Sequence, residues 1–222
     1  MVDFTDQISF YKEIDVSNFV LNLELKEKLH SAAVKYFAEN AIHKVLPGQP
    51  KLLGKAPGSR YSWQIYARKA LFNPEFSEIM SILALDLIAR EVGHFNFQMA
   101  GLETAAVPVM CSIQAHARVR GVNINVVSVR KNRKDYGLYN WIEGSLNNKP
   151  VLLVDDICNS TESLRTAMNV LAKEYNTNFI SGTFTIVNKC MRDDPNTNYN
   201  KNMPENFKPL YLFDLTDFDL IY

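Results

Sequence analysis

The sequence predicts an α/β fold in which helices flank a central parallel sheet. Strand-like apolar segments alternate with helix-like amphipathic segments from residue 95 to residue 190, a pattern typical of parallel sheets. Residues 151–154 are four consecutive apolar residues, which indicates a strand buried on both faces. Polar segments follow the predicted strands directly, and ligands of such sheets bind at the carboxyl ends of the strands. We therefore expect a ligand site along that edge.

Length and composition favour a single domain. The chain has 222 residues and a formal net charge of zero, so no general electrostatic field attracts it to nucleic acid or membrane. No apolar run is long enough to span a membrane, and the first residues are not those of a signal peptide. The three cysteines have no metal-ligand spacing, which is typical of a reduced protein and predicts a cytoplasmic location.

The part of the chain before residue 95 is predicted to contain two helices, a loop and a short strand. Apolar residues recur at helical spacing from residue 18 to about residue 40. Residues 46–61 are rich in proline and glycine and predict a loop, and residues 61–68 predict a short aromatic strand. Pro74 is expected at the start of a second helix that ends near Gly93.

The remaining segments predict the sheet and the helices that connect its strands. Strands are expected at residues 95–100, 123–130, 151–154 and 179–187. Helices are expected up to about residue 120 and over residues 164–175. Residues 192–209 are polar and predict a surface loop, whereas residues 210–218 are apolar enough to pack as a final strand or cap.

Two adjacent carboxylates, Asp155 and Asp156, follow the apolar run at the point where its strand is expected to end. Carboxylates suit sugar hydroxyls or a hydrated Mg²⁺. A polar turn then leads into a helix, whose N-terminal N–H groups suit a phosphate. A ligand with a phosphate and a free diol would satisfy both parts, and a solvated strand end followed by a helix N-cap is the alternative. The turn consists of Asn159, Ser160, Thr161, Glu162 and Ser163.

This stretch resembles the loop of type I phosphoribosyltransferases that binds 5-phosphoribosyl 1-diphosphate (PRPP). The family has an apolar strand, an acidic pair, two apolar residues and a Thr/Ser-rich turn, with a glycine where this chain has Thr161. The resemblance implies that Asp155 and Asp156 hold the ribose 2- and 3-hydroxyls, directly or through Mg²⁺. It also implies that residues 159–163 anchor the 5-phosphate.

Four cations lie among the five residues from Arg130 to Lys134. One interpretation is a solvated basic turn, and the other is a loop that closes over a polyanion and neutralises a leaving group. The segment resembles the catalytic loop of orotate phosphoribosyltransferases, which also have the Ile-Glu-Gly found here at residues 142–144. By this resemblance Arg130, Lys131 and Lys134 contact pyrophosphate, with Lys134 as the main catalytic cation. In that family the loop reaches into the neighbouring subunit's site, which implies a homodimer with shared active sites.

Three further segments are similar to parts of the same family. A stretch with serines and aromatic residues is similar to the base-binding segment, which implies roles for Ser62 and Tyr66, and an ordinary loop and edge strand is the alternative. The turn after the strand at residues 95–100 is similar to the pyrophosphate loop, which implies contacts from Glu103 and Thr104. Lys189 stands where the family often has the arginine that reads the orotate carboxylate, and it keeps the charge without the bidentate fork.

The resemblance covers roughly residues 58–190, and it implies a Mg²⁺-dependent phosphoribosyltransferase that joins orotate to PRPP in pyrimidine nucleotide biosynthesis. The single domain would comprise an N-terminal helix and base-binding hood (residues 1–70), a core (71–190) and a C-terminal loop and tail (191–222). Two alternatives remain. The acceptor could be another base, because Lys189 and the base segment depart from the family pattern. The chain could instead be a PRPP-binding regulatory protein without catalytic activity, which Thr161 in place of glycine favours.

Overall fold

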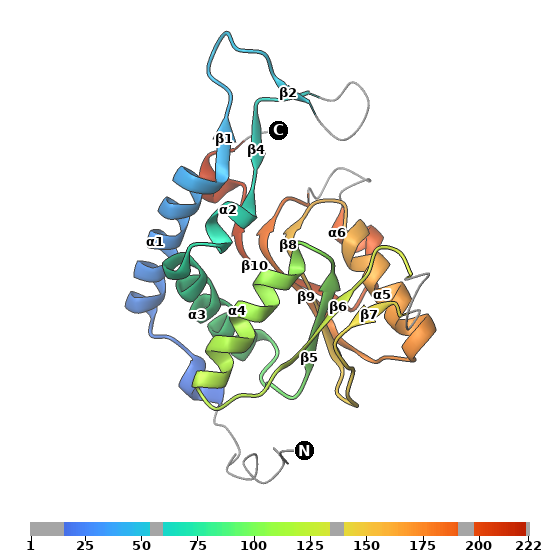
Figure 1. Ribbon diagram of the computed structural model, residues 1–222. Helices are drawn as coiled ribbons and strands as arrows, with labels where there is room; N and C mark the ends of the chain where they lie inside the picture. Colours follow the sequence, from blue (N-terminus) through green and yellow to red (C-terminus); the bar gives the residue numbers. More distant parts are fainter. Residues whose placement is uncertain (1–15, 54–59, 134–139, 191–197, 221–222) are drawn as a thin grey trace.

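A six-stranded sheet forms the centre of the molecule (Figure 1). The computed structural model describes residues 16–53, 60–133, 140–190 and 198–220. The strands of the sheet span Gln98–Leu102 (β5), Asn125–Val129 (β6), Ile142–Glu143 (β7), Val151–Cys158 (β8), Phe179–Asn188 (β9) and Lys208–Asp214 (β10). Their order is β10-β9-β8-β5-β6-β7, in which only β7 is antiparallel to its neighbour. The predicted α/β class with a central parallel sheet is therefore confirmed.

Helices cover both faces of this sheet (Figure 1). They span Leu23–Ala41 (α1), Ala67–Leu71 (α2), Pro74–Glu91 (α3), Ala106–Val119 (α4), Glu162–Tyr175 (α5) and Tyr199–Asn202 (α6), with 3-10 turns at Val16–Phe19 (η1) and Thr216–Phe218 (η2). The helices α3 and α4 pack on one face with α1 outside them, and α5 packs on the other face. In the part of the chain that the structure describes, no helix combines the length and the apolar character needed to cross a membrane.

The central strand β8 shows how the sequence produces these layers. Successive side chains of a strand point to opposite faces of the sheet. Leu152 and Val154 accordingly join the core that contains α1, α3 and α4, whereas Val151 and Leu153 join the core that contains α5. All four side chains are fully buried. An unbroken apolar run is what a strand covered by helices on both faces requires.

A small antiparallel hood lies at the carboxyl end of the sheet, at the top of Figure 1. In the hood β1 (Ile42–Lys44) pairs with β4 (Trp63–Ile65), and β2 (Leu52–Leu53) pairs with β3 (Arg60–Tyr61). The short helix α2 then leads the chain from the hood into the core. The aromatic strand predicted at residues 61–68 is thus divided between β3, β4 and the start of α2.

The prediction that the central strand ends before the acidic pair is wrong. The strand β8 continues through Asp155 and Asp156 to Cys158, because β9 supplies pairing partners as far as Asn188. Asp155 lies opposite Thr185 in this ladder and is buried. The acidic pair is therefore part of the sheet, and it is less solvated than a strand end would be.

Two terminal segments also differ from expectation. The first helix begins at Leu23 and not at residue 18, because the side chain of Asn22 caps it. The prediction of a surface loop at residues 192–209 is wrong for its described part, since α6 lies there and Tyr199 and Met203 are buried against the α5 core. The apolar tail forms β10, the final strand, as predicted. The other predicted helices and strands agree with the structure to within a few residues at their ends.

Gly101 in β5 leaves no room for a side chain. A Cβ atom there would overlap the carbonyl oxygen of Val154 and the Cβ of Ala106, and both belong to packed elements that cannot move away cheaply. We expect Gly101→Ala to lower the free energy of unfolding by about 3 kcal/mol, measured by urea denaturation. Gly182→Ala in β9 is the control, because its Cβ would lie 3.3 Å from the Lys208 carbonyl oxygen. Equal losses in the two variants would contradict this steric account.

Candidate active site

The predicted site residues gather at one edge of the sheet. The acidic pair lies near the end of β8, Glu103 follows β5, Arg130 follows β6 and Lys189 follows β9. These strands are parallel neighbours, so their carboxyl ends meet at the same edge. Lys134 lies outside the described residues, and its role stays a prediction from the sequence.

The backbone of β8 holds the two carboxylates of the acidic pair. The Oδ1 atom of Asp155 accepts a hydrogen bond from the Asp156 N–H at 2.9 Å, and that of Asp156 accepts one from the Ile157 N–H at 2.8 Å. Burial, and then the adjacent Asp156 carboxylate, raise the pKa of Asp155 to about 7. Burial also raises the pKa of Asp156, and the Arg68 guanidinium opposes that rise. Hydroxyl donors or a cation bound here would stabilise the charged pair.

The raised pKa of Asp155 makes stability depend on pH. The unfolded chain loses this proton near pH 4, whereas the folded protein keeps it up to about pH 7. The protonated Asp155 side chain therefore contributes its full stabilisation of the folded state below pH 4. This contribution is lost as the pH rises to about 7. Between pH 5 and pH 8, without ligand and in the presence of a chelator, we expect the unfolding free energy to fall by about 2–3 kcal/mol more in the wild type than in Asp155→Asn. Parallel urea titrations that show the same slope for both proteins would contradict the assignment.

The turn between β8 and α5 presents a helix N-terminus at the same edge. Thr161 occupies the N-cap position, but its side chain does not cap the helix, and its hydroxyl donates to the Ser160 carbonyl at 2.6 Å. Thr161 is buried, and its φ of 59° lies in the left-handed region that favours glycine. A hollow of about 140 Å³ opens here, lined by Asp155 and residues 157–164. Helix N–H groups, hydroxyls and a carboxylate around one hollow suit a phosphorylated sugar.

The start of the basic segment is tied to the loop that follows β5. Glu103 accepts a hydrogen bond from the Lys131 N–H at 3.1 Å, and Arg130 forms an ion pair with Glu143 at 2.7 Å. The peptide bond between Glu103 and Thr104 is cis. The Lys131 side chain is exposed. The structure thus brings the two segments predicted to meet pyrophosphate together, with Glu103 holding the backbone of the basic one.

On the hood side of the site, Lys189 lies over the ring of Trp63. The ammonium nitrogen is 4.7 Å from the ring centroid, which is a cation–π distance. Burial lowers the pKa of Lys189. Ser62 and Tyr66 are exposed, and the Tyr66 hydroxyl donates to the side chain of Gln64 at 2.8 Å. The contact of Lys189 with Trp63 thus joins the end of β9 to the hood.

Two residues of this site were not identified from the sequence. Arg68 lies in α2, and its charge acts on Asp156 in β8. Trp63 lies in β4 and contacts Lys189, which is more than a hundred residues further along the chain. Trp63 lies within the segment predicted to bind the base, and Arg68 follows that segment. This position is the only indication in the sequence that the two residues belong to the site, because no sequence pattern shows which distant side chain each of them contacts.

Comparisons with known proteins agree with this geometry. No family model matches the chain. An orotate phosphoribosyltransferase from Methanocaldococcus jannaschii is 27% identical over 135 residues, which cover 60% of this chain and 70% of that protein. A phosphoribosyltransferase structure from Corynebacterium diphtheriae aligns with a TM-score of 0.69 and 22% identity, covering 87% of this chain and 99% of that chain. The Mycobacterium tuberculosis orotate phosphoribosyltransferase in complex with PRPP aligns with a TM-score of 0.62 and 17% identity, covering 94% and 98%.

The chain has the type I phosphoribosyltransferase fold. Its sequence resembles the orotate phosphoribosyltransferases, as its acidic pair and basic segment predict. Thr161 is the clearest departure from the usual phosphoribosyltransferase pattern. The backbone of Thr161 adopts the left-handed conformation that favours glycine. The turn therefore has the same backbone conformation that a glycine at this position would allow.

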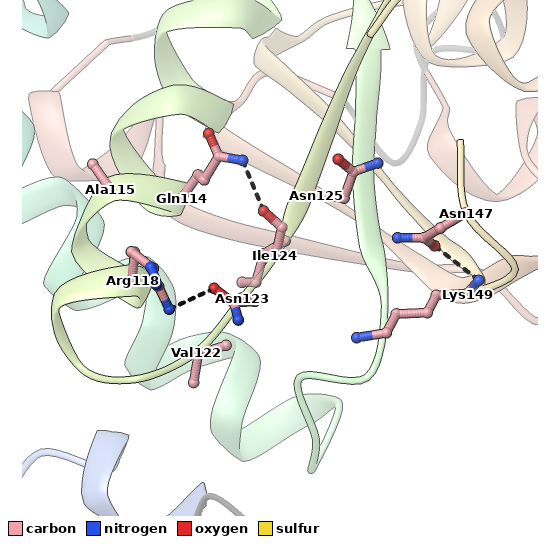
Figure 2. A pocket seen from close by; sticks show the side chains of 9 residues that line it. All are labelled: Gln114, Ala115, Arg118, Val122, Asn123, Ile124, Asn125, Asn147 and Lys149. Carbon is pink, nitrogen blue, oxygen red and sulfur yellow. Dashed lines mark hydrogen bonds between the residues drawn. The ribbon is translucent and has the colours of Figure 1, made fainter. Parts of the chain in front are cut away.

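A second hollow of this phosphoribosyltransferase fold lies at the opposite edge of the sheet (Figure 2). It has a volume of about 510 Å³ and lies between the end of α4 and the start of β6. Two of its polar side chains form hydrogen bonds with neighbouring residues. Gln114 donates to the Ile124 carbonyl, and Arg118 donates to the Asn123 side chain, both at 2.9 Å. None of the predicted site residues lines it.

Proposed function

We propose that this protein is an orotate phosphoribosyltransferase, which transfers the 5-phosphoribosyl group of PRPP to orotate and releases pyrophosphate. One observation carries the proposal: the acidic pair of β8, the N-terminus of α5 and the basic segment after β6 lie at one edge of the sheet. Each of the three suits one part of PRPP, respectively the ribose diol, the 5-phosphate and the pyrophosphate. The similarity to the M. jannaschii enzyme supports the choice of orotate.

The acidic pair would stabilise the ribose while its bond to pyrophosphate breaks. Asp155 and Asp156 accept hydrogen bonds from the 2- and 3-hydroxyls, and their charge favours a ribose that becomes cationic at the anomeric carbon. The N–H groups of α5 and the hydroxyls of Ser160 and Ser163 hold the 5-phosphate. The sugar is thereby fixed between base and leaving group, so that orotate attacks opposite pyrophosphate and inverts the anomeric carbon.

We further propose that Mg²⁺ binds together with PRPP. Among the described residues, no group of three or more His, Cys, Asp or Glu side chains could hold a metal ion by itself. Mg²⁺ commonly binds through one or two carboxylates, substrate phosphates and water, and the adjacent Asp155 and Asp156 fit that donor set. An ion held by these two carboxylates would supply positive charge to the departing pyrophosphate.

The basic segment is assigned to the leaving group. The backbone of Lys131 is fixed by Glu103, and its side chain is exposed at the edge where PRPP would bind. Lys134 is expected to supply the main charge at pyrophosphate. Arg130 is paired through Nη1 with Glu143, and its remaining guanidinium N–H groups are available to pyrophosphate. As the resemblance of this segment implies, we propose a homodimer in which each copy contributes Lys134 to its neighbour's site. The cysteine usage of the chain supports a cytoplasmic location for it.

Lys189 is assigned to the carboxylate of orotate, because its ammonium is held over Trp63 between hood and sheet. We expect Lys189→Ala to raise the KM for orotate by about 10- to 100-fold, since a hydrogen bond to a charged group contributes about 1.5–3 kcal/mol. The KM for PRPP should change by less than about threefold. Steady-state kinetics with each substrate varied in turn measure both effects. Lys189→Arg, which keeps the charge, is the control, and equal increases in both KM values would contradict the assignment.

Pyrophosphate release from PRPP and Mg²⁺, measured with a panel of bases, tests the proposed function. Release with orotate and not with uracil, adenine or hypoxanthine is the expected result. Release only with another base would keep the mechanism and change the acceptor. PRPP binding without release for any base would favour a silent regulatory protein, and Thr161→Gly would then be the variant to test for restored activity.

A further inference from the structure

Two cysteines lie face to face beside the phosphate-binding turn. Cys158 is the last residue of β8 and is buried, and Cys190 is half-buried just beyond β9. Both are free thiols, and their sulfur atoms are 3.0 Å apart. We propose that this pair is a reversible oxidation site, and that its disulfide lowers the affinity of the neighbouring turn for PRPP. The second half of this inference rests on the proposed function.

The backbone on either side holds the two thiols in place. The Lys189 N–H donates to the Cys158 carbonyl at 2.7 Å, and the Cys190 N–H donates to the Asn188 side chain at 3.0 Å. Cys158 also lies opposite Asn188 in the ladder between β8 and β9. A disulfide places its sulfur atoms about 2.05 Å apart, so an approach of roughly 1 Å closes the bond. Cys190 lies beyond the ladder and can make this movement without repacking the sheet.

The environment of Cys190 favours it as the thiol that reacts first with an oxidant. The hydrogen bond with Cys158 lowers the pKa of Cys190, which favours the reactive thiolate at Cys190. A hollow of about 260 Å³, lined by Cys190, Asn188 and Tyr199 among others, gives a small oxidant access to the nucleophile. Cys158 lines the separate hollow of the phosphate-binding turn. The pair therefore lies between the oxidant's route and the proposed PRPP site.

Hydrogen peroxide is the oxidant that we propose. The Cys190 thiolate attacks one peroxide oxygen, the O–O bond breaks, and a sulfenic acid and one water form once the departing hydroxide takes up the thiol proton. The Cys158 sulfur then attacks the sulfenic sulfur, the S–O bond breaks, and the hydroxide leaves with the Cys158 proton as a second water. The two thiols lose two electrons, which the peroxide gains. A dithiol reductant such as dithiothreitol reverses the disulfide by exchange.

The carbonyl of Asn159 connects this chemistry to ligand binding. The Cys190 thiol donates to that carbonyl at 3.2 Å, and Asn159 is the first residue of the phosphate-binding turn. Disulfide formation removes the thiol proton, and with it this hydrogen bond. The new bond also ties the end of β8 to the residue that follows Lys189. We expect the Kd for PRPP to rise about tenfold on oxidation, the effect of losing one hydrogen bond that orders the turn.

Thiol counting on the denatured full-length protein, before and after treatment with hydrogen peroxide, tests the oxidation site. We expect the count to fall from the three cysteines of the chain to the single Cys111, with a linked Cys158–Cys190 peptide in mass mapping. Cys111→Ser is the matched control and should still form the pair, whereas Cys190→Ser and Cys190→Ala should not. Three remaining thiols, or links between chains through Cys111, would overturn the proposal.

Calorimetric titration of the reduced, oxidised and re-reduced protein with PRPP and Mg²⁺ tests the effect on binding. The expected result is a tenfold weaker affinity that dithiothreitol restores and that Cys190→Ser does not show. An unchanged affinity in a protein whose disulfide has formed would overturn the regulatory half. An absence of PRPP binding in every state would contradict the proposed function and this regulatory half together, while the thiol count would still decide the oxidation site.

Discussion

Changing Asp156 to asparagine is expected to lower kcat for phosphoribosyl transfer by about 100- to 1,000-fold, as the loss of one group that stabilises transition-state charge typically does. The carboxylate lies near the end of β8, where burial raises its pKa and the charge of Arg68 opposes that rise. Asparagine can keep the hydrogen bond from the Ile157 N–H. Asparagine lacks the negative charge that stabilises the positive charge developing on the ribose in the transition state. Initial rates of pyrophosphate release at saturating PRPP and orotate measure the loss.

An exposed glutamate of α5 provides the control for this variant. Glu174→Gln removes the same charge from the surface and should leave kcat within about twofold of the wild type. The melting temperature of Asp156→Asn should not fall, because the substitution relieves the repulsion between two adjacent carboxylates. A folded Asp156→Asn protein that keeps kcat within about tenfold would contradict the role of the acidic pair.

Changing Lys134 to alanine is expected to lower kcat by about 100-fold or more while the Kd for PRPP changes by less than about threefold. The reason is that charge on the departing pyrophosphate grows mainly in the transition state, so a cation placed there stabilises that state more than bound PRPP. Single-turnover kinetics give the rate of the chemical step, and calorimetry gives the affinity. Equal losses of turnover and affinity would show that Lys134 only binds substrate.

Two further experiments define this role. Arg133→Ala removes a neighbouring cation to which no role is assigned, and it should lower kcat by less than about fivefold. Mixing inactive Lys134→Ala and Asp156→Asn subunits should restore about a quarter of the wild-type activity, because half of the randomly formed dimers then contain one intact shared site. No recovery on mixing, in a protein that sediments as a dimer, would show that each subunit supplies its own Lys134.

The fold was predictable from the sequence because its main signals are local. The apolar run of β8 and the helical spacing in α5 lie within single segments, and both were placed correctly. The end of β8 was not predictable, because it depends on the partners that β9 offers as far as Asn188. The burial of Tyr199 was missed for the same kind of reason. Its polar surroundings in the sequence predict a loop, and only the packing against the α5 core makes it an internal residue.

The candidate site likewise combines features that are contiguous in the sequence with contacts that form only on folding. The acidic pair and the turn up to Ser163 are contiguous in sequence, so their chemistry could be proposed from spacing alone. The contact of Lys189 with Trp63 and the effect of Arg68 on Asp156 join segments that meet only in the folded chain. Spacing carries no signal for such pairs. The backbone conformation of Thr161 likewise required the structure, because a β-branched residue in the left-handed region is uncommon.

The central claim is tested most directly by following PRPP, orotate and Mg²⁺ with the wild-type protein by phosphorus NMR and identifying the nucleotide product. The account predicts that one nucleoside monophosphate forms for each pyrophosphate released, with the base attached on the face opposite to the departed pyrophosphate. Unreacted PRPP that is nevertheless bound would contradict catalysis. Pyrophosphate release that proceeds equally without orotate, leaving ribose 5-phosphate, would contradict transfer to the base.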